Sequence, residues 1–440
     1  MPINKRNINN LFYTFIVTHL VIWTLVPAIT NNNLPLDTIE ALAWGSNLDW
    51  GFNKHPPASA FFVEIFFQIF GNNDLAYYFL SQLFVVISFI VVWKLSHDFF
   101  KDKIYCFLSV SILEGIYFYN YTTPEFNVYI SEIPFWALTV FYTWKTYNND
   151  KDIKNFIILG IVSAIGFLSH YLFIYLLLTI DLFFLYIFFI KKEKKFNLKF
   201  VITFIIFLII VSPHLIWLNN NEFITLSYGL HRTTLESSSM INHIQYPLIY
   251  FLKQIIILVP FWIILYLTLD KLKINKFNKK DKNIFFLFFV NFVPLILIFF
   301  TSLFLGAKIK TMWMTPFYLF NGLFFIYLFQ KQINLKKLKN FYFSCIFFFI
   351  LSPVIYFLIS ITQNDKRTDY LGKIKAEQIQ KKWDKSYSEP ILFVLGNEWD
   401  AGNLSYHIES RPVWKGFITQ EKLDSLSKFI CIDEICVGNK

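Results

Sequence analysis

The composition of this 440-residue chain excludes most classes of protein. Hydrophobic residues make up 55% of the chain, charged residues only 16%, and the mean hydropathy is +0.47. A water-soluble surface needs about a quarter charged residues, so a cytosolic globular fold, disorder, collagen and coiled coils are excluded. The sequence predicts a polytopic membrane protein. Its net charge of +10 then indicates basic cytoplasmic loops and anionic lipid rather than nucleic acid.

Apolar stretches recur along the first 361 residues. A membrane-spanning helix needs roughly 20 mostly apolar residues. Eleven such segments are predicted, of which the third to fifth are short or interrupted by polar residues. In chain order they are about 11–29, 75–93, 104–119, 128–144, 155–169, 171–190, 198–217, 247–268, 284–305, 312–330 and 341–361.

Basic residues favour one side of this predicted path. The N-terminus and alternate loops hold 23 of the 40 Lys and Arg residues, six of them between Lys271 and Lys282. The opposite loops hold four: Lys54, Arg232, Lys308 and Lys310. Because loops rich in Lys and Arg stay in the cytoplasm, the N-terminus is predicted to be cytoplasmic. Eleven crossings then put residues 362–440 outside.

Residues 362–440 differ in kind from the apolar segments before them. They carry many charges, one strand-like run at Ile391–Leu395 and helix-like stretches near 366–382 and 420–428. We predict a small external α/β domain next to a transmembrane domain of residues 1–361. Cys431 and Cys436 lie in this external part, where a disulfide and two free thiols are equal alternatives.

The first external loop, residues 30–74, carries two acids at helical spacing. If 37–48 is a helix lying on the membrane surface, Asp37, Glu40 and Trp44 share one face. Such a helix aims two carboxylates and an aromatic ring at a cleft. The same Asp-x-x-Glu spacing is also typical of a capping box with Asp37 as the N-cap, and that structural alternative stays open.

A basic pair follows in the same loop. Lys54 and His55 precede Pro56-Pro57. This pair can bind a phosphate, because lysine supplies charge and histidine a directed donor. The alternative is a basic pair that contacts lipid headgroups at the interface.

The second external stretch contributes further acids. Glu125 stands where the chain re-enters the membrane, and Glu132 lies two turns further in. Ionisable groups at membrane depth are costly and therefore indicate function. A first-turn acid is also favoured by the helix dipole, which is the structural alternative for Glu125. Glu114, inside the preceding segment, is a third candidate without a motif.

The remaining external candidates are histidines, a tyrosine and cations at the ends of predicted helices. They are His170 and Tyr171, His214, His231 and Arg232, and Lys308 and Lys310. Histidines at helix ends are often ordinary interfacial residues. However, acids, histidines and cations gather on one side of the membrane, whereas a proton-coupled transporter places its charges near the midplane.

Together these residues predict a chemistry. A carboxylate near an acceptor hydroxyl serves as a general base. The cations hold a departing phosphate, which needs preorganised positive charge. A groove among the Phe-rich helices holds the tail of a lipid-linked donor.

Several motifs resemble one family. The motifs are Leu36-Asp37-x-x-Glu40-Ala41, His55-Pro56-Pro57, Thr123-Pro124-Glu125-Phe126-Asn127, Ser169-His170-Tyr171, Pro213-His214-x-x-Trp217, Gly306-x-Lys308 through Trp313 and Pro316, and Ala401-Gly402-Asn403-Leu404-Ser405-Tyr406 with Arg411-Pro412. In this order they resemble bacterial membrane glycosyltransferases of the GT-C class. That class includes the protein O-mannosyltransferases of family 39 and the lipid A aminoarabinose transferases.

The resemblance implies a site. Family members take a sugar from a polyprenyl-phosphate donor at the periplasmic face and usually invert the anomeric centre. It implies Asp37 as the catalytic acid, Glu40 as its neighbour and Glu125 as an assisting acid. The chain departs from this pattern in three places. Asp37 and Glu40 are three apart where the aminoarabinose transferases typically have adjacent Asp-Glu, and Asn53-Lys54-His55-Pro56 replaces their Glu-Lys-Pro. Ser169-His170-Tyr171 stands where common bacterial members read Ser-Lys-Tyr. Metal ligands therefore do not carry over, and a divalent cation stays an open alternative.

The resulting hypothesis is an enzyme of the bacterial inner membrane. It transfers a sugar from undecaprenyl-phosphate-sugar to an envelope acceptor, for which lipid A or its core is our first expectation. A protein O-glycosyltransferase is the second hypothesis. A lipid-linked sugar transporter or flippase is a third, from a different class. No nucleic-acid partner is expected.

Overall fold

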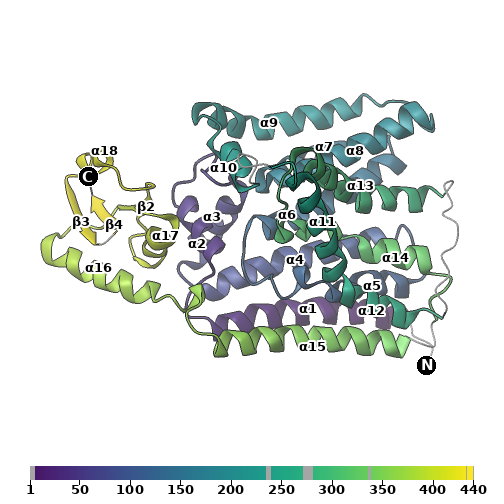
Figure 1. The fold of residues 1–440 in the computed structure, drawn as a ribbon, viewed down its shortest axis with the longest axis horizontal. Helices are drawn as coiled ribbons and strands as arrows, with labels where there is room; N and C mark the ends of the chain where they lie inside the picture. Colours follow the sequence, from purple (N-terminus) through teal and green to yellow (C-terminus); the bar gives the residue numbers. More distant parts are fainter. Residues whose placement is uncertain (1–4, 234–238, 271–280, 335–337, 433, 440) are drawn as a thin grey trace.

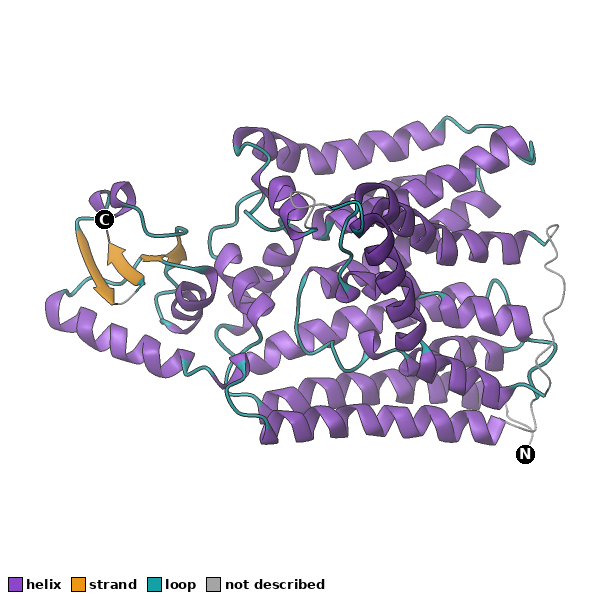
Figure 2. Ribbon diagram, viewed as in Figure 1, coloured by secondary structure: helices purple, strands orange, loops and turns teal. Residues whose placement is uncertain are grey.

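The chain folds into a long bundle of helices with a smaller domain at one end (Figure 1). The computed structural model describes residues 5–233, 239–270, 281–334, 338–432 and 434–439. Within these residues all strands lie in the end domain, and the rest of the chain is helices and loops (Figure 2). The predicted helical fold with a small C-terminal α/β part is confirmed.

The bundle contains fifteen of the α-helices in the described residues. They are α1 Lys5–Thr30, α2 Leu36–Gly45, α3 Ala58–Phe70, α4 Asp74–Ser96, α5 Lys103–Ser111, α6 Val128–Asn148, α7 Ile153–Ser169, α8 Ile174–Leu185, α9 Lys199–Asn220, α10 Ile224–Arg232, α11 Asn242–Ile257, α12 Val259–Thr268, α13 Lys282–Leu305, α14 Asn321–Phe329 and α15 Leu338–Thr362. A 3-10 helix, Thr311–Tyr318, precedes α14.

All eleven predicted segments are helical, but they are not equally suited to cross a membrane. Six helices of the described chain are long and apolar enough, and two bent pairs, α11 with α12 and Thr311–Tyr318 with α14, raise the number to eight. The other three are the third to fifth predicted segments, in α5, α6 and α7. Helix α5 passes into a 3-10 turn at Ile112, and α7 has only 17 residues.

Local sequence explains where several helices begin and break. Asn73, Asp102, Asn127 and Asp152 each precede a helix and accept hydrogen bonds from its first backbone N–H groups, which otherwise lack partners. The bend of 45° between α11 and α12 coincides with Pro260 in the first turn of α12. Proline has no N–H to continue the hydrogen-bond ladder there.

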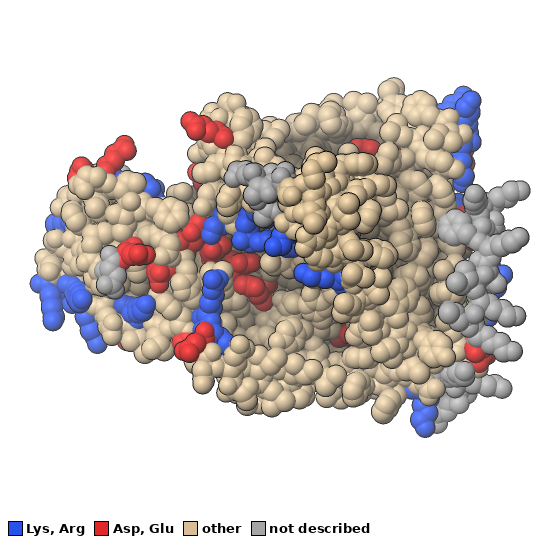
Figure 3. All heavy atoms as spheres, viewed as in Figure 1, with Lys and Arg blue, Asp and Glu red and all other residues tan. Residues whose placement is uncertain are grey.

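The two ends of the bundle differ. Helices α2, α3 and α10 and the end domain lie at one end (Figure 1), and Lys and Arg side chains lie both on the end domain and its adjoining hollow and at the opposite end of the bundle (Figure 3). The predicted orientation of the loops across a membrane stays a prediction. The predicted basic runs at 271–280 and 336–337, and the side chains of Lys5 and Arg6, lie outside the described residues.

The end domain combines three helices with a four-stranded sheet. Its elements are α16 Gly372–Ser386, β1 Phe393–Leu395, α17 Glu398–His407, β2 Val413–Trp414, α18 Gln420–Asp424, β3 Lys428–Ile432 and β4 Ile435–Asn439. The strand order is β2-β1-β4-β3. Strand β1 pairs parallel with β2 and antiparallel with β4, which also pairs antiparallel with β3. Cys431 and Cys436 lie opposite each other in the β3–β4 hairpin and form a disulfide.

The predicted α/β character of this domain is confirmed, but its elements differ from the predicted ones in their bounds and number. The predicted strand is two residues shorter at its start, because β1 begins at Phe393. The predicted helix at 366–382 begins only at Gly372, and the one at 420–428 ends at Asp424. Helix α17 and strands β2 to β4 were not predicted. The division between domains near residue 362, where α15 ends, stays a prediction.

The end domain packs directly on the first external loop. Helix α17 lies against α2, and a Cβ atom added at Gly402 would stand 3.0 Å from Ile39 Cγ2. The guanidinium of Arg411 donates to Glu64 Oε2 at 2.8 Å and to the Leu42 carbonyl at 2.7 Å. One apolar core contains Trp44 of α2 together with Trp383 and other residues of the end domain. Because α2 also packs against α3, it lies between the end domain and the bundle.

Candidate active site

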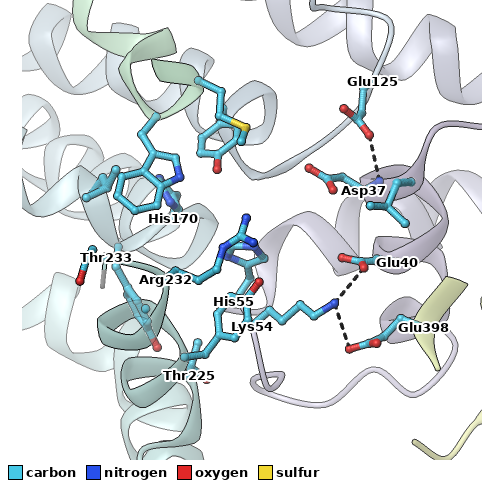
Figure 4. A pocket seen from close by; sticks show the side chains of 18 of the residues that line it. Asp37, Glu40, Lys54, His55, Glu125, His170, Thr225, Arg232, Thr233 and Glu398 are labelled. Carbon is cyan, nitrogen blue, oxygen red and sulfur yellow. Dashed lines mark hydrogen bonds and ion pairs between the residues drawn. The ribbon is translucent and has the colours of Figure 1, made fainter. Parts of the chain in front are cut away.

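A cavity of about 1140 Å³ lies between the loops at one end of the bundle, the end domain and the adjoining ends of the helices. Side chains from segments far apart in the sequence surround it (Figure 4). Among them are Asp37, Glu40, Lys54, His55, Glu125, His170, Tyr171, Arg232, Arg367, Glu398 and Trp399. Figure 3 shows acidic and basic side chains gathered in the hollow between the end domain and the bundle.

Asp37 stands in the first turn of α2. The residue at the N-cap position is Pro35, and no side chain caps the helix from that position. Instead, the backbone N–H of Asp37 donates to Glu125 Oε1 at 3.0 Å, and Thr38 Oγ1 donates to the Phe126 carbonyl at 3.1 Å. The capping-box alternative is therefore wrong, because Glu125 takes the N–H that such a box would satisfy. The Asp37 carboxylate remains directed to the cavity (Figure 4).

The environment of Asp37 favours proton transfer near neutral pH. Burial and the nearby Glu125 carboxylate raise the pKa of Asp37 to about 7, against the positive charges of Lys54, Arg232 and Arg367. Burial also raises the pKa of Glu125. A general base is most effective when its pKa lies near the working pH.

Lys54 bridges the first loop and the end domain. Its Nζ lies 2.8 Å from Glu40 Oε1 and 3.4 Å from Glu398 Oε1. Asn53 Nδ2 donates to the same Glu398 oxygen at 2.9 Å. Burial acts to lower the pKa of Lys54, but the two carboxylates raise it above its ordinary value. Lys54 is therefore a fixed positive charge at the cavity wall, and Glu40 serves it as a partner.

His55 and Trp44 form an aromatic edge of the site. Trp44 stacks on Phe52 with ring centroids 5.5 Å apart, and His55 meets Trp44 edge-on at 5.8 Å. Burial and the charges of Lys54 and Arg232 lower the pKa of His55 to about 3. The predicted Lys-His pair thus offers one cation and one uncharged imidazole, and Trp44 lies behind them in an adjoining small pocket.

The other predicted histidines divide into three positions. His170 lines the cavity, and its Nδ1 lies 3.1 Å from Glu132 Oε2. His214 is buried behind the cavity wall, where Nε2 lies 2.7 Å from the hydroxyl of Tyr171 and Nδ1 lies 2.6 Å from the Trp50 carbonyl. His231 is exposed in the last turn of α10 and is not among the residues that line the cavity.

The predicted cations also take different places. Arg232 lines the cavity, with its guanidinium 5.7 Å from the ring centre of Tyr228. Lys308 and Lys310 do not line it, although the backbone N–H of Lys308 donates to the Thr233 carbonyl at 3.0 Å. Burial and the nearby charges of Arg232 and Lys308 lower the pKa of Lys310. These two lysines therefore lie near Arg232 at the rim.

Sequence reasoning missed the part of the site that the end domain supplies. Lys366, Arg367 and Thr368 on the connection after α15, and Asn397, Glu398 and Trp399 at the start of α17, all line the cavity. A signal was present for the second group. Asn397 caps α17 directly before the Ala401–Tyr406 stretch that carries part of the resemblance.

Metal binding is a separate question. Across the part of the chain that the structure describes, no group of three or more His, Cys, Asp or Glu side chains is arranged to hold a metal ion.

Comparisons with known proteins agree with this architecture. The family model described as dolichyl-phosphate-mannose-protein mannosyltransferase matches residues 54–217. The crystal structure of ArnT from Cupriavidus metallidurans bound to undecaprenyl phosphate superimposes with a TM-score of 0.64. It is 11% identical, and the match covers 94% of this chain and 87% of that one. The chain has the GT-C fold.

The apo form of the same ArnT matches this GT-C chain almost equally, with a TM-score of 0.62, 11% identity, and coverage of 95% of this chain and 87% of that one. No curated protein matches the chain by sequence. The resemblance to GT-C glycosyltransferases is thereby confirmed, and the likeness extends over the end domain as well as the helices. The roles of individual site residues stay predictions.

Proposed function

We propose that this GT-C chain transfers a sugar from a polyprenyl-phosphate donor, undecaprenyl-phosphate-sugar, to an acceptor of the bacterial envelope. The reaction takes place at the periplasmic face of the inner membrane, with the N-terminus in the cytoplasm. Lipid A or its core oligosaccharide is the proposed acceptor.

One observation carries the proposal. A single cavity brings the acids Asp37 and Glu125 together with the cations Lys54 and Arg232. The same cavity is lined by apolar side chains of the helices and the adjoining loop, including Leu172, Leu305, Met312 and Trp313. A donor that combines an anionic phosphate with a long apolar tail matches both parts.

The residues support a direct displacement. The Asp37 carboxylate accepts the proton of the acceptor hydroxyl while that oxygen forms a bond to the anomeric carbon. The bond between this carbon and the phosphate oxygen breaks with inversion of configuration. The electron pair stays on the phosphate, where Lys54 and Arg232 stabilise the added negative charge.

Glu125 has a different role in this proposal. Because it accepts the Asp37 N–H, it fixes the start of α2 and the position of the Asp37 carboxylate. Its negative charge also raises the pKa of Asp37, so Asp37 becomes a stronger proton acceptor.

The choice of acceptor has one competing candidate. Lipid A rests on the resemblance to aminoarabinose transferases. The description of the matching family model instead favours a protein acceptor, that is, protein O-glycosylation. The two differ in which product disappears when the enzyme is inactivated.

The decisive experiment compares Asp37→Asn with Asp49→Asn, a substitution at an acid of the same loop that does not line the cavity. Lipid A from cells expressing each variant is analysed by mass spectrometry, together with glycans of periplasmic proteins. We expect Asp37→Asn to abolish the modification of lipid A, and Asp49→Asn to retain it.

Three other outcomes are informative. Unchanged lipid A with lost protein glycans moves the acceptor to protein. Full activity of Asp37→Asn overturns its role as the base. If purified wild-type protein transfers no sugar from donor to acceptor but moves the lipid-linked sugar across the bilayer of a vesicle, the chain is a transporter.

A further inference from the structure

A buried acid behind the cavity has no role in the displacement described above. Glu132 lies in α6 and is fully buried, with 0% exposure. One of its oxygens, Oε2, lies 3.1 Å from His170 Nδ1. Its other oxygen, Oε1, has no hydrogen-bond partner among the described residues.

His170 connects this acid to the cavity. It follows the last residue of α7, where the chain turns into the next helix, and it is 7% exposed as part of the cavity wall. Tyr129 packs edge-on against its ring at 5.0 Å, and His55 lies at 6.1 Å. Its second nitrogen, Nε2, makes no hydrogen bond to any described residue, and the residue is part of the cavity lining.

Burial restricts how many protons this pair can carry. An isolated charge is costly in such surroundings, so a net-neutral pair is favoured. Two net-neutral forms place the shared proton between the two side chains, whereas a proton on Oε1, which has no partner among the described residues, would be a buried donor left unsatisfied. Either a neutral Glu132 donates to Nδ1 of a neutral imidazole, or a Glu132 carboxylate accepts from an imidazolium.

Both forms have the same consequence at Nε2. In the first form Nδ1 accepts a hydrogen bond, so the proton of the neutral ring must be on Nε2. In the second form both nitrogens carry protons. Glu132 therefore keeps an N–H group at Nε2, whichever way the shared proton lies.

We propose that Glu132 makes His170 a hydrogen-bond donor that binds a non-bridging oxygen of the donor's phosphate group. His170 touches the phosphate, and Glu132 is a positioning residue that acts through it. This inference rests on the proposed function and assigns to the helix side of the cavity a phosphate ligand that adds no net charge.

The first test measures binding of undecaprenyl phosphate, the proposed product, to the purified full chain, together with KM and kcat for the donor. A hydrogen bond to a charged group contributes about 1.5–3 kcal/mol, so His170→Ala is expected to weaken phosphate binding about 10- to 100-fold. His170→Gln, whose amide can donate, should recover part of this loss. The matched control is His97→Ala. His97 lies at the C-terminal end of α4 and does not line the cavity, so this variant should bind as the wild type does.

The second test asks whether Glu132 acts through His170. Glu132→Gln alone should weaken binding by up to about tenfold. Added to His170→Ala it should cause no further loss, because the group that it positions is already absent. A purely structural role of Glu132 predicts additive losses instead.

The outcomes separate this inference from the function on which it rests. If wild-type protein neither binds undecaprenyl phosphate nor transfers sugar, the proposed function fails. If the wild type binds and transfers but His170→Ala binds equally well, this inference alone is overturned. Additive losses in the double variant remove Glu132 from the mechanism and leave His170 in it.

Discussion

The two sides of the cavity are built differently. The side formed by the helices presents aromatic and apolar groups, such as Tyr175, Leu305 and Met312, and the buried pair of His170 and Glu132. The side formed by the external loops and the end domain presents charged groups, such as Asp37 and Lys54. The difference suits the proposed donor, which is part lipid and part phosphate sugar.

The charged side also depends on more distant parts of the chain. Asp37 is positioned by Glu125, and Lys54 is held by Glu40 and by Glu398 of the end domain. On the helix side, the pairs His170–Glu132 and Tyr171–His214 join neighbouring helices. The charged side chains thus lie where several segments of the chain supply them with partners. Where the helices enclose the site, hydrogen-bonded pairs that include a histidine take their place.

The largest effect is expected from removing the central charge of the loop side. Lys54→Met removes a phosphate ligand and leaves the Glu40 and Glu398 carboxylates close together without a counter-charge. We expect kcat/KM to fall roughly 100- to 1000-fold, as for the loss of one preorganised electrostatic contact. Lys54→Arg, which keeps the charge, should lose less. Transfer assays in detergent measure this, and a Lys54→Met enzyme with near wild-type activity would remove Lys54 from the phosphate site.

An intermediate effect is expected from pH. Because the pKa of Asp37 is raised to about 7, Asp37 is a carboxylate above that pH and becomes protonated below it. A general base must be deprotonated, so kcat/KM should fall about tenfold per pH unit below 7 and level off above it.

A variant sharpens the pH prediction. The Arg232 charge lowers the pKa of Asp37, so Arg232→Gln should move the midpoint of the profile to higher pH. The profile is measured from pH 5.5 to 9 with donor below KM. A flat profile, or a midpoint that moves to lower pH in Arg232→Gln, would contradict the assignment of Asp37 as the base.

The smallest effect is expected from the link to the end domain. Glu398→Gln retains an oxygen for the Asn53 hydrogen bond but removes the negative charge beside Lys54. Since Glu40 still pairs with Lys54, we expect a loss of about three- to tenfold in kcat/KM, mainly through KM of the donor. Glu389→Gln, a change at an exposed acid of the same domain paired with Lys428, is the control. Equal activities of the two variants would mean that the end domain does not position Lys54.

Local sequence was sufficient to predict most of the helices and the cavity-lining residues of the first two external loops. Long apolar stretches identified the helices, and the charge asymmetry of the loops placed Asp37, Lys54 and Glu125 on one side. Where the pattern was ambiguous, the structure differed: Asp37 does not cap α2, because a residue 88 positions away takes its N–H. Such a partner has no local signature.

The contribution of the end domain could not be predicted for the same reason. Glu398 reaches Asn53 across 345 residues of sequence. Strands β1 and β2 contain only three and two residues, too few for alternation to be recognised. His231 shows the converse limit, since its position in an external loop suggested a role in the site although its side chain is exposed away from the cavity wall.

The tight approach of Gly402 to Ile39 and Ala43 has a consequence for biosynthesis. The helix that carries Asp37 is among the first parts of the protein to be made, and the surface that covers it is among the last. A nascent chain released at the end of α15 would present α2 with its outer face bare and Lys54 without Glu398. The cavity therefore acquires its finished geometry only after residues beyond 400 have left the ribosome, and a chain that ends before them lacks part of the proposed site.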